Sequence, residues 1–436
     1  MLNLGQLDAS GISKAIAAGQ ITANQVVSHF LECIAAAEPT IQVFAAFDAA
    51  IVADQLQQLT SSDARGPLAG IPLGVKDMFD TADYLTEFFS PIYKSNRPSR
   101  DAHVVALLRQ AGAIIIGKTH TTEFAYMHTG PTRNPHDLAR TPGSSSAGSA
   151  AGLAAGFFPI ALGTQTAGSL IKPAAYCGVY AFKPSFGLVS LEGVKPLAPS
   201  FDTVGWYGRS VADLELIAQV LIPDLLSMNR KETALKLAFW QPLNKNDLEL
   251  SVAWALDTAI QKIRTAGHQV HDLLLPTEFN TVFNDHQIVN DCEGARSLQF
   301  EKRQYANLLS LETHAMFKRA AATSWEQESM ARQRLKDLAP QLAKITKAYD
   351  AILAPSCGIV APIGLASTGP SDLIKFWTAF GLPQLNIPLK GHIGSLPAGL
   401  QVIGLFRKDC ELFTVAAQLA EIIDLGECDK VVSSTC

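Results

Sequence analysis

The sequence predicts a single large domain of the α/β class, and three observations support this prediction. Short apolar runs bounded by glycine alternate with helical stretches along the chain, which is the pattern of βαβ units. The 436 residues contain no long low-complexity linker, which disfavours two separable domains. The composition, 48% hydrophobic and 17% charged, excludes intrinsic disorder because such a chain can bury enough apolar surface to offset the entropy of ordering.

The first element is an amphipathic helix near the N-terminus. Thr22 and Gln25 have the spacing of a capping box. Apolar residues then recur on one helical face, namely Val26, Val27, Phe30 and Ile34. We expect this helix to end before Pro39, since proline removes a backbone donor and disfavours helical conformation in the residue before it.

The remaining elements follow in order along the chain. Apolar runs predicted as strands are 73–75, 114–116, 160–162, 237–240, 270–275, 351–353 and 400–403. Predicted helical stretches are 104–110, the small-residue segment 148–155, and a polar block from about 310 to 349. We expect residues from about 225 to 349 to form a peripheral helical addition.

Charge and hydropathy exclude several classes of ligand. Forty acidic residues against 35 basic ones give a net charge of -5, which disfavours nucleic acid and anionic membranes as direct partners. Residues 1–5 (MLNLG) lack the basic and apolar regions of a secretory signal. The longest small-and-apolar run, 150–162, is shorter than the ~20 residues of a membrane span. We expect a soluble, cytoplasmic protein.

The cysteines are odd in number and scattered, with no C-x-x-C spacing. They are Cys33, Cys177, Cys292, Cys357, Cys410, Cys428 and Cys436. This distribution argues against a disulfide framework or a thiolate metal site and predicts reduced, mostly buried thiols.

Two patterns resemble known sites but are better explained as structural. Residues 112–119 (GAIIIGKT) match the phosphate-loop pattern, yet the variable positions Ala-Ile-Ile-Ile are strand-forming and cannot curl around a phosphate. Histidines that could suggest a metal are His120, His128 and His136, with Asp137 beside the last, and the pair His268 and His271. None has the i,i+4 spacing of a helical metal site, and the chain has no G-x-S-x-G elbow.

The informative region runs from residue 142 to 184. Residues 143–151 (GSSSAGSAA) form a serine- and glycine-rich loop that leads into a helix, and residues 163–173 (GTQTAGSLIKP) form a strand end, a tight loop and a helix start. Successive N–H groups in such a loop create a concavity for negative charge, which is where an acyl-transfer enzyme stabilises an oxyanion. By spacing alone, a plain polar turn is also consistent with these residues.

Several ordered motifs together resemble the amidase signature family of serine hydrolases. They are residues 70–77 (GIPLGVKD), the serine-rich loop, the segment around Ser169, and residues 117–125 (GKTHTTEFA), 181–187 (AFKPSFG), 200–205 (SFDTVG) and 396–401 (LPAGLQ). The resemblance spans nearly the whole chain and is strongest from about 66 to 214. It implies one domain over residues 1–436, with a mixed central β-sheet covered by helices on both faces.

The resemblance also implies a Ser–Ser–Lys catalytic set. The family's lysine falls on Lys76, its bridging serine, held by a cis peptide bond, on Ser145, and its nucleophile on Ser169. The backbone N–H groups of Thr166, Ala167, Gly168 and Ser169 would form the oxyanion hole. A lysine can remove a serine proton near pH 7 only if burial keeps it neutral, and Leu73 and Val75 provide an apolar strand for this.

The chain departs from the family pattern at positions that bear on the substrate. Many members read G-T-D-T-G-G-S and then S-I-R, where this chain has Gln165, Ala167, Ile171 and, one place later, Lys172. Ser144 and Ala147 replace glycines, and residues 86–91 (TEFFSP) are bulkier and more aromatic than usual. Candidate substrate-binding residues are Tyr126, Ser144, Lys172 and Trp377. Phe88, Phe89 and Trp206 are further candidates for a substrate pocket. For each of the five aromatic residues, a position in the hydrophobic core agrees with the sequence at least as well as a position in the pocket.

These implications predict a hydrolase that cleaves a carbonyl–nitrogen bond, of an amide, a carbamate or a urea, through an acyl-enzyme on Ser169 and without a metal or organic cofactor. The expected partner is a small amide-type molecule, and a homodimer is compatible with the sequence. One alternative is the glutamine-hydrolysing subunit of a tRNA-dependent amidotransferase, which hands ammonia to a partner chain. Another is a catalytically silent family member, which the retention of Lys76, Ser145 and Ser169 disfavours.

Overall fold

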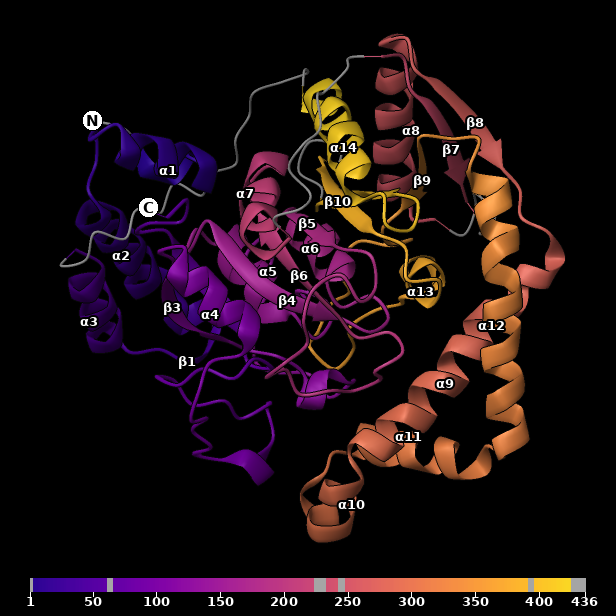
Figure 1. Ribbon diagram of the computed structural model, residues 1–436, viewed down its shortest axis with the longest axis horizontal. Helices are drawn as coiled ribbons and strands as arrows, with labels where there is room; N and C mark the ends of the chain where they lie inside the picture. The colour runs from indigo at the N-terminus through magenta and orange to yellow at the C-terminus, as the bar shows by residue number, and fades with distance from the viewer. Residues whose placement is uncertain (1–2, 61–65, 223–232, 242–247, 391–395, 425–436) are drawn as a thin grey trace.

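An 11-stranded mixed sheet forms the centre of the molecule (Figure 1). The computed structural model describes residues 3–60, 66–222, 233–241, 248–390 and 396–424. The strands are β1 (Phe44–Ala46), β2 (Pro72–Lys76), β3 (Ile114–Thr119), β4 (Ile160–Gln165), β5 (Tyr180–Lys183), β6 (Thr203–Gly208), β7 (Lys236–Trp240), β8 (Gln269–Leu273), β9 (Ala351–Pro355), β10 (Gln384–Leu389) and β11 (Ala398–Ile403). Their spatial order is β1-β3-β2-β4-β6-β5-β10-β11-β9-β7-β8. Strand β2 is parallel to β3 and β4, and β7 is parallel to β8 and β9, whereas the other neighbours are antiparallel.

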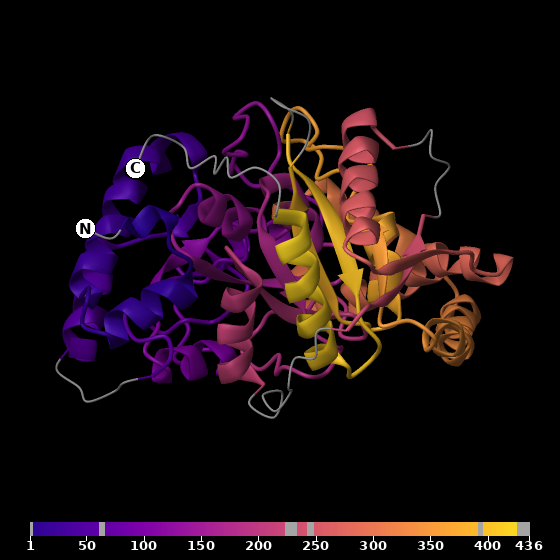
Figure 2. The same cartoon turned by 90° about the horizontal axis from the view of Figure 1, so that it is seen from above.

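Helices cover both faces of this sheet. They are α1 (Ala9–Ala17), α2 (Ala23–Ile41), α3 (Ala49–Thr60), α4 (His103–Gln110), α5 (Ala147–Ala154), α6 (Ile171–Cys177), α7 (Val211–Leu221), α8 (Leu250–Thr265), α9 (Val282–Ser297), α10 (Gln299–Tyr305), α11 (Leu311–Ala322), α12 (Trp325–Thr346), α13 (Asp372–Ala379) and α14 (Asp409–Asp424). The Tyr207 hydroxyl donates to backbone carbonyls just before α6, whereas the Trp206 indole donates to the Leu214 carbonyl in α7. Because consecutive strand residues point to opposite faces, α6 and α7 lie on opposite sides of the sheet. Figure 2 shows α14, in yellow, lying along the neighbouring strands. The predicted single α/β domain is confirmed.

Helices α9 to α12 form an arm that projects from the body, with α10 at its lower end (Figure 1). We call residues 282–346 the helical arm. Its second half, α11 and α12, corresponds to the polar block predicted at about 310–349. The two helices are separate because Ser324 starts α12 with a capping box to Gln327. The arm follows two strands, β7 and β8, that extend the sheet.

Three local predictions have different outcomes. The prediction that the N-terminal helix ends before Pro39 is wrong, since α2 runs from Ala23 to Ile41 and contains Pro39. Its last turn closes with the Gln42 N–H donating to the Glu38 carbonyl at 2.9 Å, while the Glu38 carboxylate accepts from Val43 and Phe44. The Thr22 capping box is present, as predicted. Residues 114–119, from the segment that matches the phosphate-loop pattern, form strand β3, also as predicted.

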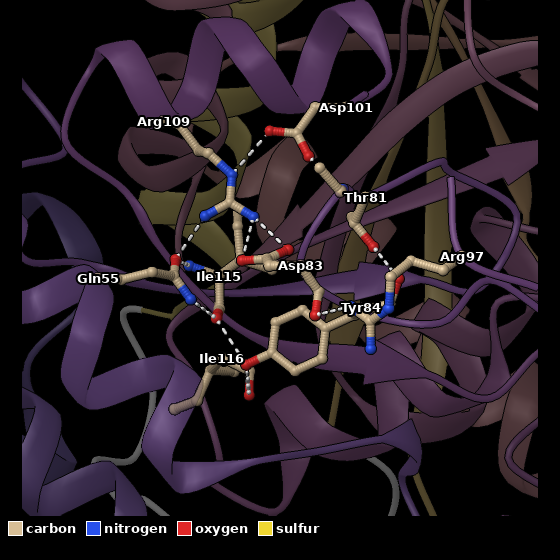
Figure 3. Close-up of polar contacts among 10 residues, drawn as sticks. Gln55, Thr81, Asp83, Tyr84, Arg97, Asp101, Arg109, Ile115 and Ile116 are labelled. Atoms are coloured by element: carbon tan, nitrogen blue, oxygen red, sulfur yellow. Dashed lines mark hydrogen bonds and ion pairs between the residues drawn. The ribbon is translucent and has the colours of Figure 1, made fainter. Parts of the chain in front are cut away.

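A charged network fixes the edge of the sheet near β1 (Figure 3). Strand β1 is paired with β3 only at residues 118 and 119, so the backbone of Ile115 needs another partner. The Gln55 amide supplies it, accepting from the Ile115 N–H and donating to its carbonyl, both at 2.9 Å. Arg109 then holds Gln55, Asp83 and Asp101 together, with contacts of 2.6 to 2.9 Å. The network links α3 and α4 to β3, which is the neighbour of β2 in the sheet.

The described cysteines are consistent with reduced thiols. Cys33, Cys177, Cys292 and Cys357 are buried and Cys410 is partly buried, and none is in a disulfide. Cys428 and Cys436 lie outside the described residues. In the part of the chain that the structure describes, no helix is both long enough and apolar enough to cross a bilayer.

Candidate active site

The predicted catalytic residues meet at one edge of the sheet, where β2 and β4 end. These strands are parallel neighbours, with Val75 paired to Leu162, so their carboxyl ends lie side by side. Lys76 is the last residue of β2, and the loop that carries Ser169 begins directly after β4. The strand topology therefore brings together residues that are 93 positions apart in the chain.

Lys76 is a fully buried amine in an apolar strand. Its side chain lies on the same side as Gly74, where a Cβ would collide with Phe158, so Lys76 points toward the α5 side of the sheet. The Nζ atom lies 2.8 Å from Ser145 Oγ and 2.7 Å from Thr164 Oγ1. Burial holds the pKa of Lys76 well below its usual 10.5, because the charged ammonium cannot be solvated there.

Asp202 is the carboxylate that opposes this effect. Its negative charge raises the pKa of Lys76, but less than burial lowers it. Asp202 is itself buried and is held by the Thr166 hydroxyl at 2.6 Å and the Leu197 N–H at 2.8 Å. It therefore links the loop after β4 to the segment before β6.

The serine-rich loop places two serines between Lys76 and Ser169. Ser145 contacts Lys76, whereas the Ser169 hydroxyl lies 3.0 Å from the hydroxyl of Ser144. The expected cis peptide bond at Ser145 is not present, because all peptide bonds of the described residues are trans. Trans is the lower-energy form for a non-proline residue. The serine whose hydroxyl is hydrogen-bonded to Ser169 is Ser144, and not Ser145 as expected. Ser146 docks the loop onto the end of β4 through the Thr164 backbone.

The loop after β4 is held by its carbonyl groups. The carbonyls of Thr166, Ala167 and Gly168 accept hydrogen bonds from His286 Nε2 (2.9 Å), Thr378 Oγ1 (2.8 Å) and the Lys172 N–H (3.0 Å), respectively. In a trans peptide the N–H of the next residue points opposite to the carbonyl. The N–H groups of residues 167, 168 and 169 are thus directed away from these partners, and no described acceptor is hydrogen-bonded to them. This is the arrangement that an oxyanion hole requires.

Gln165 stands where many family members have an aspartate, and its neutral side chain holds the backbone at the start of α6. Its side-chain carbonyl accepts from the N–H groups of Leu170 and Ile171, at 2.9 and 3.1 Å. Its amide nitrogen donates to Thr378 and Gln384. The buried side chain thus satisfies two donors at the start of α6, where the family's aspartate would bring a charge that Ile171 cannot neutralise.

Lys172, a candidate substrate-binding residue, has its amine fully used within the protein. The buried Nζ donates to Thr368 Oγ1 at 3.2 Å, to the Gly369 carbonyl at 2.6 Å and to Ser371 Oγ at 2.8 Å. Burial lowers its pKa to about 8. Ser371 in turn lies against Gly168, where a Cβ would come within 3.1 Å of it. Lys172 therefore supports the segment that packs on the loop after β4.

We expect Lys172→Met to act mainly on stability. The change leaves the Gly369 carbonyl without its buried donor, which costs about 1–3 kcal/mol of unfolding free energy. Urea denaturation of the variant measures this loss. A rise in KM confined to substrates with a carboxylate, at unchanged stability, would instead show that Lys172 binds substrate.

The aromatic candidates separate into two groups. Trp377 is fully buried and packs edge-to-face on Trp240 and Phe376, so it belongs to the core and not to a substrate pocket. Trp206 is buried in the sheet as well. Tyr126 is only partly buried, and its hydroxyl is held by Asp291 and Arg319 of the helical arm.

Several residues of the site were not singled out from the sequence. Thr164 follows the glycine of β4 and contacts Lys76, while His286 and Thr378 come from helices distant in the chain. The position of Thr164 could have suggested it, since it lies near the carboxyl end of β4, beside the end of β2 that carries Lys76. Nothing in the local sequence around His286 or Thr378 indicates a role.

Comparisons with known proteins agree with this geometry. The family model described as Amidase matches residues 25–413. The chain is 30% identical to a glutamyl-tRNA(Gln) amidotransferase subunit from Symbiobacterium thermophilum, over 94% of this chain and 95% of that protein. It is 35% identical to the subunit of the same name from Carboxydothermus hydrogenoformans, over 63% of this chain and 62% of that one.

Among solved structures, the native peptide amidase from Stenotrophomonas maltophilia superposes with a TM-score of 0.83 and 26% identity, covering 96% of this chain and 97% of that one. The family match covers most of the chain, and the motifs that carry it surround the Lys76 and Ser169 edge of the sheet. The chain therefore belongs to the Amidase family.

Proposed function

We propose that the protein is an amidase that hydrolyses a carbonyl–nitrogen bond in a small amide-type molecule through an acyl-enzyme on Ser169. The observation that carries this proposal is the buried Lys76 amine, 2.8 Å from Ser145 Oγ, at the strand edge where Ser169 also lies. An amine whose pKa is lowered by burial is a base near neutral pH, and a serine hydroxyl needs such a base to become a nucleophile.

The reaction then proceeds in two halves. Ser169 Oγ attacks the substrate carbonyl, and its proton passes to the Lys76 amine through the serine-rich loop, in which Ser144 contacts Ser169 and Ser145 contacts Lys76. The N–H groups of residues 166–169 stabilise the resulting oxyanion. Collapse breaks the carbon–nitrogen bond, and the leaving nitrogen takes the proton from Lys76. A water molecule, deprotonated by the same route, attacks the acyl-enzyme, releases the acid and restores the proton to Ser169.

A second candidate is the glutamine-hydrolysing component of an amidotransferase, favoured by the names of the relatives above. Glutamine carries a carboxylate next to its amine, which needs a cation in the site. The residues at and after the family's arginine position do not offer one, because Ile171 is apolar and the Lys172 amine is bonded to three internal acceptors. This supports a substrate without a carboxylate at the end remote from the scissile amide bond, where glutamine carries one.

The purified chain, assayed alone, separates these candidates. Nitroanilides, aliphatic amides, carbamates and glutamine are incubated with it, and released amine or ammonia is measured. We expect turnover of at least one neutral amide without any partner chain. Glutamine hydrolysis that appears only with a co-purifying partner would support the amidotransferase component, and failure of a fluorophosphonate probe to label Ser169 would indicate a silent family member.

A further inference from the structure

A buried histidine of the helical arm contacts the loop that carries the nucleophile. His286, in α9, is 1% exposed and its Nε2 lies 2.9 Å from the carbonyl oxygen of Thr166. The two residues are 120 positions apart, and His286 stacks on Phe201 with ring centroids 4.2 Å apart. A side chain from outside residues 66–214, where the family motifs are densest, thus contacts the peptide between Thr166 and Ala167, just after β4.

The environment of His286 determines which nitrogen carries the hydrogen. A carbonyl oxygen can only accept, so Nε2 must be the protonated nitrogen. Nδ1 is buried and has no partner among the described residues, so a second hydrogen there would be an unsatisfied donor. Burial also lowers the pKa of the imidazole to about 3, so the ring is neutral under all ordinary assay conditions.

We infer that His286 is a positioning residue for the oxyanion hole. The inference rests on the proposed function. By holding the Thr166 carbonyl, the Nε2–H orients the peptide whose N–H belongs to Ala167, so that this donor faces the developing oxyanion. Thr378 does the same for the next peptide through the Ala167 carbonyl.

Loss of the His286 donor affects the transition state more than the bound substrate. Without it, the peptide between Thr166 and Ala167 loses the hydrogen bond that fixes its plane, and its N–H is directed less accurately at the reacting oxygen. The charge on that oxygen is full in the tetrahedral species and only partial in the substrate carbonyl. A misdirected N–H therefore lowers kcat more than it raises KM.

The helical arm is then part of the catalytic apparatus. Its other contacts reach segments that border the site. Glu301 of α10 pairs with Lys195 at 2.5 Å, and Thr313 of α11 donates to Glu123 at 2.7 Å. These contacts dock the arm on the body and so fix the position of α9, from which His286 reaches the loop.

Two substitutions separate positioning from packing. His286→Phe keeps the ring that stacks on Phe201 but removes the donor, whereas His286→Gln restores an N–H donor near the place of Nε2. We expect kcat of the Phe variant to fall about 10- to 100-fold, with KM little changed. This loss is smaller than the roughly 100- to 1,000-fold loss typical when an oxyanion donor itself is removed. We expect the Gln variant to recover most of kcat.

Affinity for an inhibitor that forms a tetrahedral adduct, such as a trifluoromethyl ketone, should weaken in parallel with kcat, while affinity for a non-reacting substrate analogue should not. If the Phe variant does not fold, His286→Met takes its place. As a matched control, His268→Phe removes a histidine that accepts from the Leu235 N–H at the β7–β8 end of the sheet, and it should leave kcat unchanged.

Each outcome bears on the inference separately from the proposed function. Wild-type kcat in the Phe variant, or equal losses in the Phe and Gln variants, would overturn the positioning role while wild-type turnover and labelling of Ser169 still support the amidase. An unlabelled and inactive wild-type protein would instead overturn the proposed function itself.

Discussion

Ser169→Ala is expected to lower turnover by more than about a thousandfold while the protein stays folded. The substitution removes the attacking oxygen, and loss of a nucleophile in a serine hydrolase typically costs more than this factor. The fold should persist because the backbone of this loop is held independently of the hydroxyl, with the Ser169 carbonyl accepting from Tyr207 at 3.3 Å. Steady-state kinetics and circular dichroism measure the two effects.

A control serine distinguishes chemistry from folding. Ser210 caps α7, on the opposite face of the sheet, by accepting from the Asp213 N–H. Ser210→Ala should cost about 1 kcal/mol of stability and leave turnover intact. Residual activity of the Ser169→Ala enzyme above about a thousandth of wild type would require another nucleophile. Ser144, 3.0 Å away, would be the first to examine.

Lys76→Met is expected to be nearly inactive at neutral pH. Methionine keeps most of the apolar volume of the lysine stem, so the buried strand remains filled, but it has no amine to accept the serine proton. Since burial lowers the pKa of Lys76, the wild-type rate should rise with pH as the amine loses its proton and level off above an inflection well below 10.5. The methionine variant should lack this inflection. A pH–rate profile from about pH 5 to 10 tests both statements.

The matched control is another buried lysine. Lys183 in β5 is fully buried, donates to the Pro184 carbonyl, and has a pKa lowered to about 7 by burial. Lys183→Met should change stability but leave the pH profile of the remaining activity as in wild type. Wild-type turnover in Lys76→Met would mean that the basicity of Lys76 is dispensable, and the Ser–Ser–Lys mechanism would have to be abandoned.

The local pattern of residues was sufficient for the α/β class and for strands β2, β3, β4, β7, β8, β9 and β11, but not for β1, β5, β6 and β10. The capping box at Thr22, the strand at residues 114–119 and the polar helices of the arm are each encoded within a few neighbouring positions, where periodicity and capping act. The end of α2 was predicted wrongly because proline affects only its own donor and its immediate neighbour, and the Glu38 carboxylate closes the turn beyond it.

The motifs also placed Lys76 and Ser169 in one site, and the parallel pairing of β2 with β4 supplies the physical reason that they meet. The neighbour of Ser169, the burial of Trp377 and the occupied amine of Lys172 depend on side chains that approach from other parts of the chain. His286 and Thr378 hold the loop from 120 and 211 residues away. Such contacts cannot be predicted from the local spacing of residues. A hydrogen bond between distant segments depends on how the sheet and its helices pack and not on either segment alone.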